Sequence, residues 1–102
     1  MHQVAAIYRF ESELFQTATE AAWVFVMLPP EAADEIAEAV PRRPGFGSVR
    51  VVVQIGSTEW KTSLFPSKEL GSYVLPVKRS VRDRERIDTG DSVAVAVRIT
   101  ED

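Results

Sequence analysis

The sequence contains no cysteine and a single histidine, His2. Disulfide bonds and metal sites with thiolate ligands are therefore excluded, and no second histidine is available to complete a zinc site. Carboxylates remain as metal ligands, but the acidic stretch of residues 31–38 would offer only an unspecific site for a divalent cation. We therefore expect no metal and no cofactor.

The sequence also lacks a long apolar run and a strong net charge. No segment approaches the roughly 20 apolar residues that cross a bilayer, and the N-terminal residues lack the basic and apolar regions of a signal peptide. The net charge is −3 over 102 residues, so no overall field attracts the chain to nucleic acid or to an anionic membrane. We expect one soluble domain over residues 1–102, without membrane association, and the lack of cysteine suits the cytoplasm.

Recognisable catalytic motifs are missing as well. Ser57, Ser63 and Ser80 have no histidine near them in the sequence and no nucleophile-elbow motif around them. The Gly-Phe-Gly stretch at 45–47 lacks the further glycine and the lysine of a phosphate-binding loop. An enzyme whose site is assembled from residues far apart in the sequence is the third alternative, and we lean toward a protein without catalytic activity.

Alternation of apolar and polar residues is the strongest pattern that the sequence does contain. It is clearest over Ser48–Phe65, where alternating valines lead into a turn at Gly56-Ser57. A two-residue turn with glycine first is typical of a type II′ hairpin. The resulting register pairs Val53 with Trp60 on the core side, and a slip by one residue would move the tryptophan into solvent.

Four further stretches are predicted to be strands, separated by helices or by polar loops. The continuous apolar run of residues 21–28 predicts a central strand that is covered on both sides. The predicted strands are Gln3–Phe10, Ala21–Leu28, Tyr73–Leu75 and Ser92–Ile99. Glu11–Glu20 is predicted to be the end of a strand followed by a loop, and Pro66–Ser72 a polar loop.

Two short helices are predicted between these strands. The first begins at the double proline 29–30, which ends the preceding strand and favours a first helical turn, and it stops at Pro41. The second covers Val77–Ile87, with Val81 and Ile87 as its apolar anchors. The apolar stripe of the first helix consists of Ala33, Ile36, Ala37 and Val40.

These elements form an internal repeat. Residues 26–55 and 73–99 both run from an apolar strand through Leu-Pro and a helix to a glycine and alternating valines, with Leu28 matched to Leu75. Neither half could bury its strands alone, because isolated hairpins are marginally stable in water. We therefore predict a mainly β fold: a small double-split β-barrel of two strand–helix–strand units related by pseudo-twofold symmetry, with two short helices.

Four motifs in the chain resemble a family of small bacterial domains of unknown function. The motifs are GFGSVRV at 45–51, IGSTEWKTSLFP at 55–66, YVLPVKRSVR at 73–82 and GDSV at 90–93. Family members are small double-split β-barrels, sometimes fused to a bacteriocin-protection-type module. The resemblance therefore implies a fold and no activity, and we expect these 102 residues to carry the barrel without that module.

A more distant similarity links the Leu-Pro…Arg…Gly-Asp-x-Val pattern to the swapped-hairpin DNA-binding domains of antitoxins and transition-state regulators. Those domains are dimers in which each chain supplies one unit. Here both units lie in one chain, and the first predicted helix is acidic. The similarity implies DNA binding, but this departure from the pattern argues against it.

The candidate binding residues are positively charged. They lie in the second predicted helix and in the loop after the first helix, and they are Lys78, Arg79, Arg82, Arg84, Arg86, Arg42 and Arg43. A basic helix can neutralise phosphates. The alternative is a solvated helix whose cations pair with the interleaved Asp83, Glu85 and Asp88.

Other polar and aromatic residues are expected to be structural. Trp23, Trp60 and Tyr73 could stack on a ligand or a base, but packing in the core is the preferred interpretation. Asp91 is expected to accept hydrogen bonds from backbone amides of its turn instead of acting as a catalytic acid.

Together these observations predict a non-enzymatic binding or interaction module for a small anionic ligand or a protein partner. Nucleic-acid binding through the basic helix, residues 78–86, is the alternative. Because the first helix is acidic and the second is basic, we also predict that the two helices meet, within one chain or across a homodimer.

Overall fold

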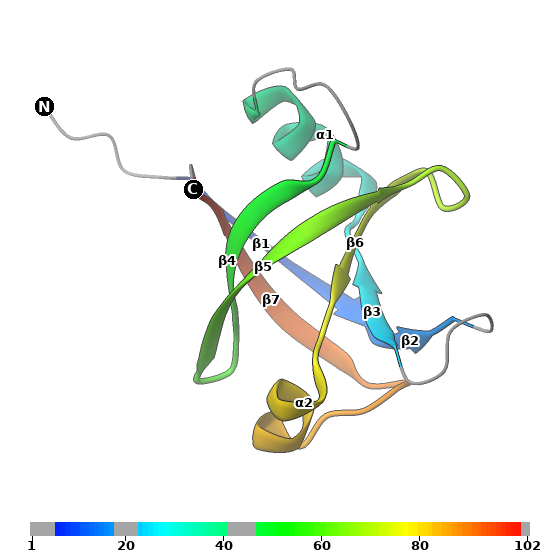
Figure 1. The fold of residues 1–102 in the computed structure, drawn as a ribbon, viewed down its shortest axis with the longest axis vertical. Helices are drawn as coiled ribbons and strands as arrows, with labels where there is room; N and C mark the ends of the chain where they lie inside the picture. The colour runs from blue at the N-terminus through cyan, green and yellow to red at the C-terminus, as the bar shows by residue number, and fades with distance from the viewer. Residues whose placement is uncertain (1–5, 18–22, 41–46, 101–102) are drawn as a thin grey trace, which may run out of the picture.

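The computed structural model describes residues 6–17, 23–40 and 47–100, which form a mainly β structure with two helices (Figure 1). The elements are β1 (Ile7–Glu13), β2 (Phe15–Gln16), β3 (Val24–Met27), α1 (Pro30–Ala39), β4 (Val49–Ile55), β5 (Thr58–Ser67), β6 (Ser72–Pro76), α2 (Arg79–Glu85) and β7 (Ser92–Ile99).

The strands form one antiparallel sheet in the order β1-β7-β4-β5-β6-β3-β2, which curls into a half-barrel (Figure 1). The two ends of this sheet are β1 and β2, which are separated in the chain only by the fully buried Leu14. The N–H of Leu14 donates to the carbonyl of Asp91 at 2.9 Å, and the N–H of Gly90 donates to the carbonyl of Leu14 at 2.9 Å. The hydroxyl of Ser12 donates to the carbonyl of Met27 at 2.7 Å, so the curl also ties β1 to β3.

The β4–β5 hairpin has the register predicted from the sequence. Val53 pairs with Trp60, Val51 with Thr62, and Val49 with Leu64. Gly56 has φ 60°, whereas Ser57 is not among the described residues with positive φ, which is the combination that a type II′ turn requires. This prediction is therefore confirmed.

The core lies on the concave side of the curled sheet and consists mainly of branched aliphatic side chains. Alternating valines of β4 and β7 supply one wall, and Leu64 and Leu75 are fully buried on β5 and β6. The predicted inward valines of β7 are buried at positions 93, 95 and 97. Full burial of a residue of this size contributes about 1.5–3 kcal/mol, so these strands supply much of the stability.

The helices begin and end close to the predicted positions, and they cover opposite ends of the half-barrel (Figure 1). Helix α1 starts at Pro30, where the missing N–H of proline costs no hydrogen bond. Ala33 and Ile36 are buried as predicted, but Ala37 is exposed and Ala32 is buried in its place. The buried face therefore lies nearer the N-terminal end of the helix than predicted, while Val40 is partly buried against the core.

Several predicted boundaries were wrong. β1 continues to Glu13, within the predicted strand end, but it is followed by a second strand, β2, where a loop was predicted. β5 continues through Pro66 to Ser67. Proline is tolerated there because the carbonyl of its partner Tyr73 accepts from the N–H of Leu28, the residue after β3. The Pro66–Tyr73 pair therefore makes no hydrogen bond between β5 and β6.

The prediction of a central strand covered on both sides at residues 21–28 was also wrong. Val24 and Val26 of β3 are buried, but Trp23 is 53% exposed and Phe25 is only partly buried. β3 is instead covered on one face, and its aromatic residues lie on the outer face. The predictions for residues 3–5, 18–22 and 41–46, which include Arg42 and Arg43, lie outside the described residues.

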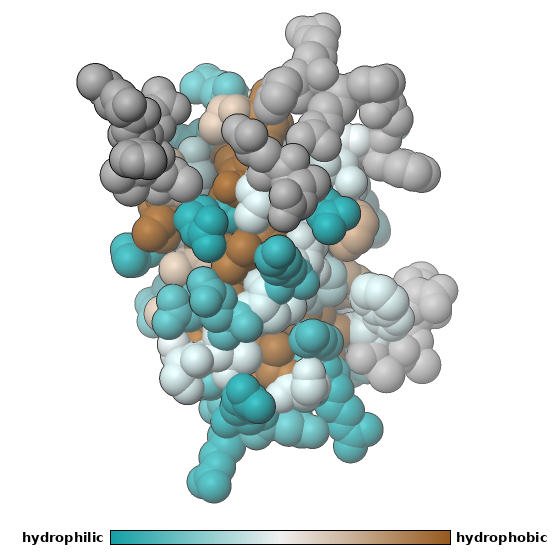
Figure 2. Space-filling view, turned by 60° about the vertical axis from the view of Figure 1, so that its left-hand side comes forward, coloured by the Kyte–Doolittle hydropathy of each residue, from teal (hydrophilic) through white to brown (hydrophobic). Residues whose placement is uncertain are grey.

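The surface is polar over much of its area. On the face drawn in Figure 2, hydrophobic residues reach the surface as small patches between hydrophilic ones. Among the described residues, no helix combines the length and the apolar composition that are needed to cross a membrane.

Candidate functional site

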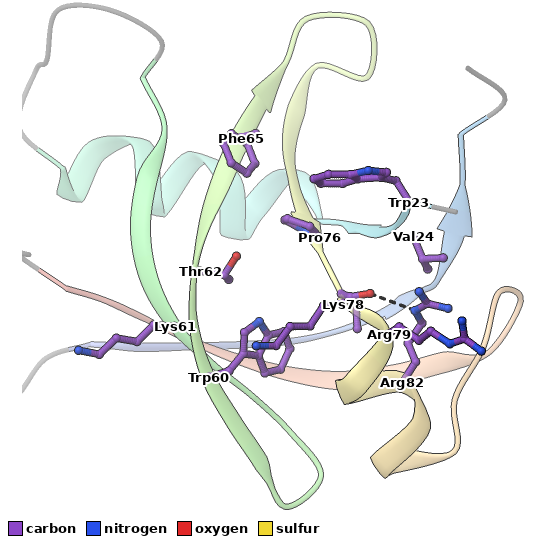
Figure 3. A pocket seen from close by; sticks show the side chains of 11 residues that line it. Trp23, Val24, Trp60, Lys61, Thr62, Phe65, Pro76, Lys78, Arg79 and Arg82 are labelled. Carbon is purple, nitrogen blue, oxygen red and sulfur yellow. Dashed lines mark hydrogen bonds between the residues drawn. The ribbon is translucent and has the colours of Figure 1, made fainter. Parts of the chain in front are cut away.

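A pocket of about 470 Å³ opens where β5 diverges from β6 and α2 begins (Figure 3). β6 pairs with β5 only from Phe65 to Ser67, so the earlier part of β5 and the start of α2 leave a gap between them. The lining residues are Trp23, Val24, Trp60, Lys61, Thr62, Phe65, Pro76, Val77, Lys78, Arg79 and Arg82.

Aromatic side chains and a proline form the apolar walls of this pocket. Trp60 is half-buried on β5 and packs against the core, whereas Phe65, further along the same strand, is 43% exposed. Trp23 stands before β3 with its ring 5.8 Å from that of Phe25, at an interplanar angle of 26°. Pro76, the last residue of β6, lies between Trp60 and Trp23 in Figure 3.

The cationic side of the pocket is supplied by α2 and the residue before it. The guanidinium of Arg82 is oriented by a hydrogen bond from its Nε to the carbonyl of Val77, at 3.0 Å. Val77 is itself anchored, because its N–H donates to the carbonyl of Val24 in β3 at 2.9 Å. Lys78 is exposed and extends in the direction of Trp60 (Figure 3).

Arg79 is held less firmly than Arg82. Its Nε lies 3.8 Å from a carboxylate oxygen of Asp83, and the two side chains are 84% and 72% exposed. An exposed pair of this kind contributes at most about 1 kcal/mol, so Arg79 can turn toward a ligand. Lys61 extends away from the other lining residues (Figure 3), because it alternates with the inward Trp60 and Thr62 along β5.

A carboxylate at the C-terminal end of α2 attaches this helix to the β4–β5 hairpin. Glu85 accepts hydrogen bonds from the hydroxyl of Thr58 at 2.5 Å and from that of Ser57 at 3.3 Å. The bond from Thr58 lowers the pKa of Glu85; burial acts in the opposite direction, and the contacts with Ser57 and the charge of Arg84 lower it further. Helix α2 is thereby attached to the β4–β5 turn and to the start of β5.

The structure separates the predicted basic residues into two groups. Lys78, Arg79 and Arg82 line the pocket, whereas Arg84 and Arg86 are exposed on α2 away from it. Arg86 is the only described residue other than glycine with positive φ, at 58°, and it caps the helix in the left-handed conformation.

The remaining candidates have structural positions. Asp91 accepts a hydrogen bond from the N–H of Asp88 at 2.9 Å, so its predicted role in the turn is confirmed. Tyr73 packs against the core, as predicted. The described residues contain no group of three or more histidine or acidic side chains that could hold a metal ion.

Sequence reasoning missed Thr62, Phe65 and Pro76 as pocket residues, and it assigned Trp23 to the core. Pro76 and Phe65 were assigned only to the end of a strand and to a hairpin. The proximity of aromatic residues to the basic helix depends on pairings between distant strands, and no local pattern reports such pairings. One signal was available in the sequence: Trp60 and Phe65 lie on opposite faces of the predicted strand, and only one of these faces was predicted to be buried. One of the two aromatic rings therefore had to be exposed.

Comparison with known proteins identifies the family and no activity. No curated protein matches the chain. One protein-family profile matches residues 10–97, which include every described lining residue of the pocket, and its description is a domain of unknown function. The chain therefore belongs to this family, DUF1905.

Proposed function

We propose that the protein is a non-enzymatic binding module that takes a small anionic ligand in the pocket between β5 and α2. The observation that carries this proposal is the combination of aromatic walls with Lys78, Arg79 and Arg82 along one side. Ligand pockets are typically apolar concavities of 300–1,000 Å³ with a few convergent polar groups, and a volume of about 470 Å³ falls within this range.

The charges around the pocket favour an anion. None of the described lining residues is acidic, and a cation near low-dielectric aromatic walls attracts a negative charge more strongly than it would in water.

The same lining favours binding over catalysis. Thr62 supplies a hydroxyl, but the described lining includes neither a histidine nor a carboxylate that could serve as a general base for it.

We also propose that the curled sheet is a double-split barrel whose two halves are related by pseudo-twofold symmetry. The pairings of β3 with β6 and of β4 with β7 support this, because equivalent strands meet in this way around a twofold axis. In one half, β5 pairs with both β4 and β6. In the other half, β1 pairs with β7 and β2 pairs with β3, and β1 and β2 are joined at Leu14, so together they correspond to β5. These registers favour matching Leu14 with Leu64 and Val26 with Leu75, in place of the predicted match of Leu28 with Leu75.

Such symmetry would give the pocket a counterpart between β1 and β3. The counterpart is closed by a hydrogen bond whereas the pocket is open, and this difference supports a binding role for the pocket. At the counterpart, the hydroxyl of Ser12 donates to the carbonyl of Met27 at 2.7 Å and closes the gap. The equivalent residues at the pocket are Thr62 and Pro76, which make no such bond. One gap is therefore closed, and the other stays open between aromatic and cationic side chains.

The experiment uses the two indole N–H signals of the chain, because its only two tryptophans, Trp23 and Trp60, both line the pocket. Benzoate, citrate and inorganic phosphate are titrated separately into ¹⁵N-labelled protein. We expect at least one of these anions to shift both indole signals at millimolar concentration. Failure of all three would contradict the proposal.

A matched pair of variants assigns any binding to the pocket. The variant K78A/R79A/R82A removes three of the four cations that line the pocket and leaves Lys61, and K68A/R84A/R86A removes three exposed cations outside it, so both lose the same charge. We expect the first variant to lose the shifts and the second to keep them. Equal behaviour of the two variants would show that the response comes from overall charge.

Nucleic-acid binding through α2 is the second candidate, and the position of the aromatic residues favours single strands over duplex. Trp23, Trp60 and Phe65 offer faces on which bases can stack beside the helix. Against this candidate, acidic residues interleave with the cations of α2. This candidate is tested by titrating the wild type and R79A/R82A/R86A with single-stranded and duplex DNA at 50 and 200 mM salt. Unchanged DNA binding in the variant would reject the candidate.

We further propose that the protein acts in the cytoplasm as a single domain, alone or as a homodimer. The absence of cysteine supports the location, since a reducing compartment makes disulfides unnecessary. A protein partner remains an alternative occupant of the apolar walls around Trp23 and Phe65, whose exposure supports it.

A further inference from the structure

We infer that the pocket binds a planar aromatic carboxylate, with its carboxylate on Arg82 and its ring system against the tryptophans. This inference rests on the proposed function and specifies the chemical class of the ligand. It depends on three features: the flat apolar walls, the fixed orientation of one guanidinium, and the one-sided distribution of charge.

The walls select for a flat ligand. Trp60, Phe65 and Trp23 present aromatic rings, and Pro76 adds a rigid ring between them (Figure 3). Aromatic pairs gain about 0.5–1.5 kcal/mol beyond the burial of apolar area, and they do so in stacked or edge-to-face contacts that a puckered aliphatic ring cannot reproduce. The partial exposure of Trp23 and Phe65 leaves their faces accessible to such a ligand.

The orientation of Arg82 selects for a carboxylate. Its Nε is already bonded to the carbonyl of Val77, which holds the plane of the guanidinium at the edge of the pocket. The two terminal nitrogens of Arg82 make no hydrogen bond to any residue that the structure describes. A carboxylate can accept from both at once, and such bidentate pairs are stronger and more directional than contacts with a lysine.

The distribution of charge selects for a single anionic group at one end of the ligand. Lys78, Arg79 and Arg82 all belong to α2 or to the residue before it, whereas the facing residues are apolar apart from Thr62 and Lys61, and Lys61 extends away from the others (Figure 3). Of these three, only Arg82 is fixed by a hydrogen bond to the backbone. A ligand with one carboxylate next to a flat apolar body matches this arrangement, while a polyphosphate would place further charges against the aromatic walls.

The experiment compares four probes by calorimetry and by the two indole N–H signals. 2-Naphthoate has both required features, naphthalene-2-carboxamide lacks the charge, cyclohexanecarboxylate lacks the planar ring, and inorganic phosphate lacks an apolar body. We expect 2-naphthoate to bind with one site per chain and at least tenfold more tightly than each of the other three.

Two lysine variants test the assignment of the carboxylate. R82K keeps the charge but loses the forked donor and the bond to Val77, so it should weaken 2-naphthoate binding at least tenfold. R84K is the matched control, because Arg84 is exposed on the same helix but does not line the pocket, and its affinity should stay within twofold of the wild type. The backbone amide spectrum verifies that both variants are folded. Equal effects of R82K and R84K would overturn the role of Arg82.

The outcomes separate this inference from the proposed function. Binding of cyclohexanecarboxylate or phosphate as tightly as 2-naphthoate, with loss in K78A/R79A/R82A, would overturn the aromatic requirement and leave anion binding intact. Binding of the carboxamide as tightly as 2-naphthoate would overturn the anion requirement and with it both proposals. Absence of binding by all four probes would overturn this inference, and the proposed function would then be decided by the titrations with benzoate and citrate.

Discussion

At the scale of single residues, the clearest lesson concerns α2, where charge pattern and role diverge. In the sequence the helix is a run of interleaved basic and acidic residues, and in the structure these residues make different contacts. Arg82 bonds to backbone, Arg79 pairs with Asp83, and Glu85 attaches the helix to a hairpin turn. The function of each side chain follows from what it contacts, and its charge alone does not reveal it.

The lowered pKa of Glu85 predicts a pH-dependent contribution to stability. Its folded pKa lies below the unfolded value of about 4.3, so the contribution is complete above that value and disappears as the pH falls through the folded pKa. We expect E85Q to lower the urea midpoint at pH 7 and to differ progressively less from the wild type below pH 4.3. E59Q, at an exposed position on β5, is the control. A constant difference between E85Q and wild type down to pH 2 would contradict this account.

The left-handed conformation of Arg86 predicts a stabilising substitution. Its φ of 58° and ψ of 48° are unfavourable for a residue with a Cβ and easily adopted by glycine. We expect R86G to raise the free energy of unfolding by about 0.5–1 kcal/mol, measured by urea denaturation. R84G, inside the same helix, should instead lower it by about 0.5–1 kcal/mol. A destabilised R86G would show that its side chain contributes more than the strain costs.

At the scale of elements, how far the sequence predicts the fold depends on how local the signal is. The β4–β5 hairpin and β7 were predicted correctly, because alternation and turn chemistry are encoded within each segment. β1 and β2 were predicted incompletely, because Glu11 and Glu13 face outward and break the apolar pattern. The pocket could not be predicted, since Trp23, Trp60 and Arg82 are brought together only by the curl of the sheet.

The contact between α2 and the β4–β5 turn gives a prediction at this scale. Gly56 has φ 60°, and a Cβ at this position would lie 2.0 Å from a carboxylate oxygen of Glu85. We expect G56A to lower the free energy of unfolding by about 2–3 kcal/mol, because strain adds to the loss of the bond from Thr58.

G71A is the matched control, since Gly71 has φ 69° but no heavy atom within 4 Å of the added Cβ. It should cost about 1 kcal/mol, from backbone strain alone. Equal costs for G56A and G71A would mean that Glu85 turns aside freely and does not hold α2 on the hairpin.

At the scale of the whole molecule, the two helices of opposite charge do not meet within one chain. Helix α1 and helix α2 lie at opposite ends of the half-barrel (Figure 1), so the predicted contact inside the chain is wrong. The reason is that each helix packs on its own side of the curled sheet. Contact between the helices of two copies remains a prediction.

This prediction can be tested by sedimentation. If α1 of one copy meets α2 of another, a dimer should form at 20 mM salt and weaken at 300 mM, because exposed charges are screened within about 10 Å at 0.1 M salt. E35K/E38K on α1 should abolish it, and E11K/E59K, with the same charge change on exposed sheet positions, should not. A monomer at both salt concentrations would remove the idea.

The pairing of β1 with β7 has a consequence for how the protein is made. Among the described strands, β1 is synthesised first, and it hydrogen-bonds along its length to β7, which is synthesised last. Until Ser92–Ile99 has been synthesised, β1 lacks its partner, and so does the edge of β4 that pairs with β7. Such long-range pairing slows folding and exposes strand edges in the meantime. Folding of this sheet must therefore wait for β7, and holding chaperones should recognise chains that stop before it.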